Sequence, residues 1–290
     1  MSTKNFGYIN EPFCNYETSK VVILPVPYDA TRKWLVGWKT NTAKGPAAII
    51  TASCNMELYD EELGKTTAEI GIHTLKQLKP EKTPEQMHNS IYKRSQELIK
   101  KNKFIVMLGG EHSITSGSVK AYKEKYNNLS VLQLDAHSDL REEFEGTKHS
   151  HASVMRRIVN LGVKTVQVGI RSQDEDEARL IEEKGLSVFY AKDVVDNDEW
   201  MDKAINELTD CVYITIDLDG FDPGIMPSTG TPEPGGLGWY QAIKFLRRVA
   251  DKKKVVGFDV VELAPISGLH HADFTAAKLV YKLLGYVFNG

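Results

Sequence analysis

Short runs of β-branched and other apolar residues recur along the chain, and each run is bounded by Gly, Asp or Pro. Runs of this kind predict buried β-strands, because both faces of the strand must be covered. The predicted strands are residues 21–26, 104–108, 130–135, 163–170, 212–217 and 255–262.

Helical segments separate these strands, and two of them carry clear start signals. Residues 84–101 follow Thr83, a favourable N-cap residue, and begin with proline, which suits the first helical position. Residues 175–184 follow Asp174, another favourable N-cap. The alternation of strand and helix predicts an α/β protein with a parallel sheet covered by helices on both faces.

The composition limits the class of protein. The chain is 41% hydrophobic and 26% charged, which is enough to build a sizeable core, and no linker or repeat divides it. We therefore expect a single domain over residues 1–290. The net charge of −3, with scattered lysines and arginines, argues against a nucleic-acid partner. The apolar runs are too short to cross a bilayer, so no membrane partner is expected.

The cysteines and the N-terminal residues indicate the cellular compartment in which the protein is expected. Cys14, Cys54 and Cys211 are odd in number, far apart and form no Cys-x-x-Cys pair. This pattern argues against a disulfide framework and against a sulfur-ligated zinc site. Residues 1–10 lack the basic and then apolar stretches of an export signal. We expect a cytoplasmic protein.

Three of the predicted strands end in imidazole and carboxylate side chains. Ligands of open parallel sheets bind beyond the carboxyl ends of the strands, so chemistry is expected there. A single His at a strand end is usually structural and a single Asp is usually a helix cap, but three such ends together favour a functional site. The segments are 109–113 (Gly-Gly-Glu-His-Ser), 135–139 (Asp-Ala-His-Ser-Asp) and 217–219 (Asp-Leu-Asp).

The crowding of four aspartates at one edge of a sheet implies bound metal, because the carboxylates repel each other unless cations neutralise them. Six ligands exceed the four that a tetrahedral zinc ion takes. Two metal ions roughly 3.5 to 4 Å apart, bridged by carboxylates and a water, would use all six. The oxygen-rich shell with imidazoles favours manganese over zinc, with iron or cobalt as alternatives.

The spacing within the second segment constrains its backbone. In a straight strand Asp135, His137 and Asp139 would share one face but span roughly 13 Å, too far to surround one metal pair. We therefore predict that the strand ends near Asp135.

These segments resemble the signature blocks of the ureohydrolase family of arginases and agmatinases. The third block, at residues 217–236, is the most specific, with Asp-Leu-Asp-Gly-Phe-Asp-Pro followed by Thr-Gly-Thr-Pro-Glu-Pro-Gly-Gly. The resemblance covers nearly the whole chain. It implies a three-layer α/β/α sandwich with a central parallel sheet, two Mn²⁺ ions per chain and a homo-oligomer, trimer or hexamer. By the family pattern the manganese ligands are His112, Asp135, His137, Asp139, Asp217 and Asp219.

The resemblance also implies two catalytic residues. His151 is similar to the family's mobile catalytic histidine, and the residues after it match the family better than those after His149. Glu262 looks like the glutamate that binds the guanidinium group. Taken alone, His151 would be interpreted as a surface histidine on a loop and Glu262 as a strand-end cap or salt-bridge partner.

The implied reaction is hydrolysis of a guanidinium group with release of urea. A metal-bridging hydroxide would attack the guanidinium carbon. Glu262 would orient the planar cation by accepting two parallel N–H bonds, and His151 would protonate the leaving amine.

The chain departs from the family pattern at three places. Glu111 replaces the commoner aspartate of the first block, and Ser228 stands where Gly or Ala is usual. Residues 34–38 (Trp-Leu-Val-Gly-Trp) replace the Pro-Gly loop of many relatives. That loop can touch substrate, so the motifs alone do not identify which guanidino compound is the substrate.

Agmatine is the first expectation for the substrate, and its cleavage would give putrescine and urea. The segment between the metal cluster and the catalytic histidine carries Glu142, Glu143 and Glu145, which suit a substrate tail ending in ammonium. The alternative is an exposed charged face. The arrangement of Asn and Ser side chains with which arginases hold arginine is absent from this segment. Arg141 and Lys148 keep guanidinobutyrate, with its anionic tail, as an alternative.

Other classes of protein fit less well. A two-metal phosphoesterase needs basic side chains to hold phosphate, and the surroundings of the cluster are acidic. Gly235, Gly236 and Gly238 follow no strand directly, which argues against a nucleotide-binding loop. A non-catalytic metal-binding relative remains an alternative, against which the presence of both His151 and Glu262 argues.

Overall fold

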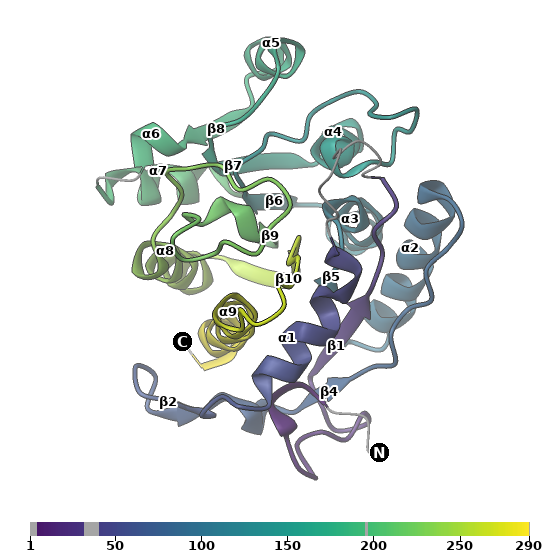
Figure 1. Cartoon of the computed structure of the whole chain (residues 1–290), viewed down its shortest axis with the longest axis vertical. Helices are drawn as coiled ribbons and strands as arrows, with labels where there is room; N and C mark the ends of the chain where they lie inside the picture. Colours follow the sequence, from purple (N-terminus) through teal and green to yellow (C-terminus); the bar gives the residue numbers. More distant parts are fainter. Residues whose placement is uncertain (1–4, 32–40, 195–196, 290) are drawn as a thin grey trace.

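The computed structural model describes residues 5–31, 41–194 and 197–289. At its centre is an eight-stranded sheet in which all neighbouring strands are parallel. Helices cover both faces of this sheet, which confirms the three-layer α/β/α sandwich (Figure 1). The strand order is β4 (Ile72–Thr74), β1 (Val21–Val26), β5 (Phe104–Gly109), β10 (Lys254–Val261), β9 (Cys211–Asp217), β6 (Leu129–Leu134), β7 (Lys164–Ile170) and β8 (Ser187–Tyr190).

All six predicted strands are present, with bounds within one residue of those expected. The two edge strands, β4 and β8, are not predicted from the sequence. β4 has only three residues, and every side chain of β8 is half-buried, so neither forms the continuous apolar run of a central strand. A small antiparallel pair, β2 (Tyr59–Asp60) and β3 (Lys65–Thr66), is also not predicted.

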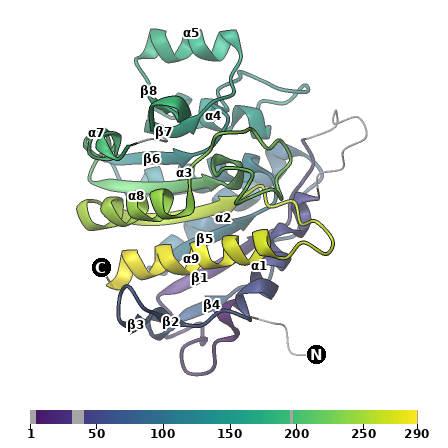
Figure 2. The same ribbon diagram turned by 60° about the vertical axis from the view of Figure 1, so that its left-hand side comes forward.

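The helices form one layer on each face of the sheet (Figure 2). One layer contains α1 (Gly45–Ser53), α6 (Ala191–Val194), α7 (Glu199–Glu207), α8 (Trp239–Lys252) and α9 (His271–Asn289). The other layer contains α2 (Pro84–Lys100), α3 (Thr115–Lys125), α4 (Val154–Asn160) and α5 (Glu175–Lys184). Short 3-10 helices are η1 (Phe6–Tyr8), η2 (Thr42–Lys44), η3 (Thr67–Ile70), η4 (His112–Ile114), η5 (His151–Ser153) and η6 (Leu218–Gly220).

The two predicted N-caps are confirmed. The Thr83 hydroxyl accepts a hydrogen bond from the backbone N–H of Gln86 at the start of α2. At the start of α5, Asp174 and Glu177 form a reciprocal capping box, in which each side chain accepts the backbone N–H of the other residue. These caps satisfy N–H groups that have no partner inside the helix.

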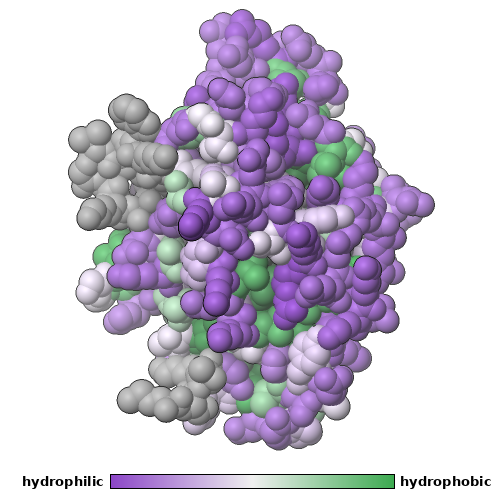
Figure 3. Space-filling view, turned by 90° about the vertical axis from the view of Figure 1, so that its right-hand side faces the viewer, coloured by the Kyte–Doolittle hydropathy of each residue, from purple (hydrophilic) through white to green (hydrophobic). Residues whose placement is uncertain are grey.

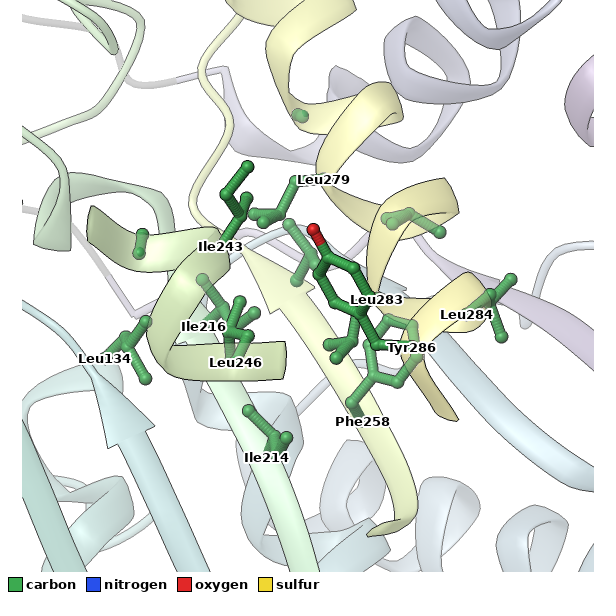
Figure 4. Close-up of a cluster of buried hydrophobic side chains, with 14 of the residues drawn as sticks. Leu134, Ile214, Ile216, Ile243, Leu246, Phe258, Leu279, Leu283, Leu284 and Tyr286 are labelled. Carbon is green, nitrogen blue, oxygen red and sulfur yellow. The ribbon is translucent and has the colours of Figure 1, made fainter. Parts of the chain in front are cut away.

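The sheet is buried on both sides by two hydrophobic clusters, one under each helical layer. Every residue of β1 and β6 is buried, as expected for parallel strands covered on both faces. Figure 4 shows one of these clusters, in which side chains of β9 and β10 meet those of α8 and α9. The contacting residues include Ile214, Ile216, Phe258, Ile243, Leu246, Leu279 and Leu283.

The outer surface contrasts with this core. The side of the molecule that carries α2 is mostly hydrophilic, with small apolar areas between the polar side chains (Figure 3). Within the described residues, no helix is both long and apolar enough to cross a membrane.

Candidate active site

The polar segments predicted from the sequence converge at the carboxyl ends of the four central strands. η4 follows β5, residues 135–139 follow β6, and η6 follows β9. Glu262 follows β10, which lies between β5 and β9. Because neighbouring parallel strands end at the same edge of a sheet, segments that are far apart in the sequence meet here.

A glycine lets the first segment approach its neighbours. A Cβ atom on Gly110 would lie 1.9 Å from the carbonyl oxygen of Tyr28, so no larger residue fits at this position. The next residue, Glu111, donates its backbone N–H to the same oxygen over 2.8 Å. The close contact holds the start of η4, and with it His112, against the end of β1.

The second segment leaves the strand where the sequence analysis expects it. β6 ends at Leu134, so the prediction that the strand ends near Asp135 is confirmed. The Asp135 carboxylate accepts the backbone N–H of His137 over 2.6 Å and folds the chain back on itself. Asp139 has a φ of 54°, a left-handed conformation that non-glycine residues seldom adopt. The three side chains therefore do not spread along a straight strand, and those of His137 and Asp139 lie in two groups that share Asp135.

The third segment is held against the second by hydrogen bonds. Asp217 accepts the backbone N–H of Asp219 over 3.0 Å, and Asp219 accepts the backbone N–H of Ala136 over 3.1 Å. The Arg171 guanidinium donates to the carbonyl oxygens of Asp219 and Glu233 over 2.7 and 2.8 Å. This arginine therefore ties the start of the third block to its later part.

The first group of candidate ligands surrounds His112. Its Nδ1 atom lies 3.1 Å from Asp135 Oδ2, 3.1 Å from Asp139 Oδ2 and 3.4 Å from Asp217 Oδ2. All four side chains are buried. One imidazole nitrogen and three carboxylate oxygens therefore enclose a single position.

The second group surrounds His137 and shares Asp135 with the first. His137 Nδ1 lies 3.0 Å from Asp219 Oδ2 and 3.7 Å from Asp135 Oδ1. Ligand atoms of Asp135, His137 and Asp219 all lie within 4.8 Å of one another, as do those of His112, Asp135 and Asp139. Asp135 thus directs one oxygen to each group, as a carboxylate that bridges two metal ions would.

The protonation of His112 follows from its hydrogen bonds. Thr215 donates its hydroxyl proton to Asp259 over 2.6 Å, so it accepts a hydrogen bond from His112 Nε2–H over 2.8 Å. In a neutral imidazole the lone pair then lies on Nδ1, facing three carboxylates. Lone pairs and negative charges that face each other need a cation between them, so this donor set fits a divalent metal ion.

The pKa values of the carboxyl groups reflect the same missing positive charge. Burial, followed by the charge of Asp135, raises the pKa of Asp139 to about 6. Burial, followed by the charges of Asp219 and Asp135, raises the pKa of Asp217 well above its ordinary value. Without metal these groups stay together by taking up protons, on the carboxyl groups and on His112 and His137, whose pKa values the nearby carboxylates raise despite burial. Metal binding would therefore release protons.

His151 lines a cavity beside the two groups of candidate ligands. It lies in η5, and its ring meets the Phe144 ring edge-on at 5.4 Å between centroids. The cavity has a volume of about 290 Å³ and contains His137, Asp139 and Asp217 in its wall together with His151. The remaining wall residues are Arg141, Phe144, Ala152, Ser172, Gln173, Glu177 and Thr231. The structure therefore brings the predicted catalytic histidine to the same cavity as three predicted ligands.

Glu262 lies closer to the ligands than to the open part of this cavity. It is 0% exposed and has a φ of 69° immediately after β10. Its Oε1 atom accepts the backbone N–H of His112 over 2.8 Å, and its own backbone N–H is donated to Gly110 over 2.8 Å. The carboxylate is thus held against the first ligand segment, and it is not among the described residues that line the cavity.

The acidic segment after Asp139 differs from the prediction. Glu142 is paired with Arg156, Arg157 and Lys148 over 3.0, 3.1 and 3.5 Å. Glu142 therefore already has three basic partners, which favours the alternative of an exposed charged face over a receptor for a substrate ammonium.

The other two glutamates of that segment, Glu143 and Glu145, are also absent from the described lining of the cavity. The structure favours the alternative of an ion-paired surface segment over a substrate-binding one. A sequence cannot show which face of an irregular loop turns toward a cavity.

Arg141 and Lys148, the cations that left guanidinobutyrate as an alternative substrate, also form ion pairs. Arg141 lines the cavity, but it lies 3.0 Å from the Asp174 carboxylate and stacks over the Phe144 ring. Lys148 belongs to the ion pairs of Glu142. An anionic substrate tail would therefore meet an arginine that is already neutralised.

Several residues that support the candidate ligands and His151 through hydrogen bonds are not predicted from the sequence. Thr215 lies two positions before Asp217 on β9, and Asp259 is a carboxylate inside the apolar run of β10, a pattern that could have singled it out. Thr31 contacts both Glu111 and His151, and no local pattern links these three positions. The predicted substrate loop at residues 34–38 lies outside the described residues.

The chain is similar to known proteins over nearly its whole length. A sequence model of the Arginase family matches residues 19–285. The N(1)-aminopropylagmatine ureohydrolase of Synechocystis sp. is 42% identical, covering 96% of this chain and 92% of that protein. The agmatinase of Pyrococcus horikoshii is 34% identical, covering 94% of each chain. The crystal structure of the agmatine ureohydrolase of Thermoplasma volcanium has a TM-score of 0.88 at 30% identity, covering 100% of this chain and 96% of that chain.

Fold, site and comparisons together define a hydrolase of the ureohydrolase class, as the resemblance implied. The chain belongs to the arginase family. Members of this family are binuclear metal enzymes, and the two histidine–aspartate groups that share Asp135 are the matching feature of this chain.

Proposed function

We propose that the protein releases urea from a guanidine whose tail carries amino groups, with N(1)-aminopropylagmatine as its first substrate. The observation that carries the reaction is the pair of ligand groups sharing Asp135 beside the cavity of His151. The choice of substrate rests on the Synechocystis relative of that name, which is 42% identical, whereas the Pyrococcus agmatinase is 34% identical.

The metal ligands in this proposal are the six residues predicted from the sequence, with Mn²⁺ as the ion. An oxygen-rich shell with one imidazole in each group suits manganese better than zinc, which prefers four ligands. When bound, two such ions lower the pKa of water and supply hydroxide at neutral pH. The proposed ligands are His112, Asp135, His137, Asp139, Asp217 and Asp219.

Glu262 and His151 act on the substrate. The Glu262 carboxylate accepts N–H bonds from the guanidinium and fixes its plane near the ligand groups. Water supplies the oxygen that becomes the carbonyl of urea, the bond between the guanidinium carbon and the alkylated nitrogen breaks, and His151 gives a proton to the departing amine. The roles require both residues at one site. His151 lines one cavity with three of the proposed ligands, and Glu262 accepts the backbone N–H of a fourth, His112.

The charge of the cavity supports a cationic tail. Glu177 lines it and contributes a carboxylate beyond those of the metal ligands. Each Glu177 oxygen accepts one backbone N–H, from Leu140 over 2.7 Å and from Asp174 over 2.8 Å, and each retains a second lone pair. A polyamine ammonium therefore meets a fixed negative charge there.

The test is urea release by the manganese-loaded protein on N(1)-aminopropylagmatine, agmatine, guanidinobutyrate and arginine. We expect kcat/KM to be at least about tenfold higher on the first substrate than on guanidinobutyrate or arginine, about 1.4 kcal/mol of discrimination. Glu177→Gln should raise KM for the cationic substrates, and Glu182→Gln on the exposed face of α5 should not. A higher efficiency on arginine or guanidinobutyrate would refute the assignment of substrate class.

Agmatine itself is the second candidate. It carries the same guanidinobutyl group and a single ammonium, and the agmatine ureohydrolase of Thermoplasma volcanium has the same fold over the full chain. Turnover of agmatine at a higher kcat/KM than N(1)-aminopropylagmatine would make it the substrate, with putrescine and urea as products. The trimer or hexamer implied by the family stays a prediction, which light scattering of the purified protein would test.

A further inference from the structure

Thr31 is in direct contact with the candidate catalytic histidine. It lies on the chain segment after β1, 120 residues before His151, and is 2% exposed. Its hydroxyl oxygen lies 2.9 Å from His151 Nδ1 and accepts the backbone N–H of His151 over 3.2 Å. One hydroxyl group therefore contacts both the ring and the backbone of the same histidine.

Glu111 holds Thr31 in this place. Its Oε2 atom accepts the backbone N–H groups of Ala30 and Thr31 over 3.0 and 2.8 Å. Its Oε1 atom accepts the hydroxyl of Ser113 over 2.6 Å. Glu111 is fully buried, so these bonds are shielded from water and their geometry is well defined.

We propose that Thr31 is a positioning residue for His151, and that Glu111 sets the place of Thr31. In the neutral histidine, the Thr31 hydroxyl donates to Nδ1, so the ring proton is on Nε2. In the protonated histidine, Nδ1–H donates to the same oxygen, which has a second lone pair. Thr31 therefore supports both protonation states of the ring and directs proton transfer to the substrate through Nε2.

This geometry also explains why the first signature block of this chain contains a glutamate. The carboxylate of an aspartate is one methylene shorter, and it would not reach the backbone of Ala30 and Thr31 from position 111. The departure from the family pattern at Glu111 is thus matched to the contact between Thr31 and His151.

The inference rests on the proposed role of His151, and its test has two readouts. The first is kinetic. Thr31→Val should lower kcat about tenfold, part of the 10²–10⁴-fold that a general acid contributes, with KM changed by less than about twofold. Thr31→Ser keeps the hydroxyl and should restore kcat.

Thr42→Val is the matched control, because it removes another buried threonine hydroxyl that makes no hydrogen bond to any described residue. It should leave kcat unchanged. If Thr31→Val fails to fold, Thr31→Ala, which only removes atoms, carries the same expectation.

The second readout needs no substrate. Long-range ¹H–¹⁵N NMR of the metal-free, histidine-labelled protein should show His151 as the Nε2–H tautomer, and Thr31→Val should give a mixture of tautomers. The His151 signals are assigned by their loss in His151→Asn.

An unchanged tautomer together with an unchanged kcat in Thr31→Val would overturn the proposal. If the wild-type protein hydrolyses no guanidine, the proposed function fails, and the tautomer still decides whether Thr31 positions His151. Glu111→Asp should lower kcat and change the His151 tautomer in the same direction as Thr31→Val, but less. Full activity with an unchanged tautomer in Glu111→Asp would show that Glu111 does not set the place of Thr31.

Discussion

Two groups of charged residues lie in different parts of this molecule, and their charges are balanced by different means. The candidate metal centre gathers four aspartates around two imidazoles at the carboxyl edge of the sheet. The second group, called here the Lys282 cluster, joins α8 and α9 to the segment at β2. It consists of Asp60, Glu62, Arg247, Lys282 and Tyr286.

The Lys282 cluster contains its own counter-ions. Lys282, with 5% of its side chain exposed, lies 3.0 Å from Asp60 and 2.6 Å from Glu62. Burial alone would raise the pKa of Glu62, but hydrogen bonds from Lys282, Tyr286 and Arg247 outweigh burial and lower it to about 2. The Glu62 carboxylate therefore stays ionised without any ligand.

In the candidate metal centre the groups that face the four aspartates are two imidazoles, whose pKa values the carboxylates raise despite burial. Burial and neighbouring carboxylates raise the pKa values of Asp139 and Asp217. The carboxylates of the Lys282 cluster are thus paired with permanent cations of the protein, whereas those of the candidate metal centre are balanced by protons on His112 and His137 or by bound metal ions. Three variants would break or sharpen this comparison.

Asp135→Asn should have the largest effect, because Asp135 contributes to both ligand groups. We expect loss of both metal ions and a fall in urea release of more than about a hundredfold. Elemental analysis after dialysis against Mn²⁺, with the urea assay in parallel, measures both. Asp60→Asn is the control and should retain its metals. Two metals in Asp135→Asn would show that the shared carboxylate is not a ligand.

Lys282→Met should act on stability and not on metal. Removing the ammonium leaves two acidic groups without their main partner, which costs about 3 kcal/mol in the free energy of unfolding. Urea denaturation of the metal-free protein gives this value, with Lys278→Met on the same helix as control. We also expect the variant to bind as much metal as the wild type. A loss of metal would show that the Lys282 cluster and the candidate metal centre are not independent.

The pH dependence of the Lys282 cluster is the smallest effect. Since the pKa of Glu62 is lowered from 4.5 to about 2, its ion pairs stabilise the fold above pH 4.5 and are lost as the pH falls toward 2. The difference in unfolding free energy between wild type and Glu62→Gln should therefore shrink over this interval. A difference that stays constant between pH 6 and pH 2.5 would show that Glu62 acts through packing and not through charge.

The sequence predicts the centre of the molecule better than its edges. Central strands such as β6 are apolar throughout because they are buried on both faces, and the motif residues follow these strands directly. The edge strands β4 and β8 have no such run and are missed. Acidic residues predict the site best where a strand end fixes their direction, whereas the direction of Glu142, which lies on a loop and pairs with Arg156, does not follow from its position in the sequence.

The supporting residues lie beyond what a single sequence reveals. The contact of His112 with Thr215 joins positions 103 residues apart, and that of Thr31 with His151 joins positions 120 residues apart. Such contacts depend on how the strand order β1, β5, β10, β9, β6 brings loops together. Only the folded chain shows which hydroxyl group faces which imidazole.

The central claim is that the carboxyl edge of the sheet binds two metal ions through ligands that share Asp135. The most direct test is the number of manganese ions bound per chain by the wild-type protein, measured by elemental analysis after equilibrium dialysis. The account predicts two ions per chain, with protons released as they bind because the pKa values of Asp139 and Asp217 are raised. A saturating value of one ion, or of none, would contradict it.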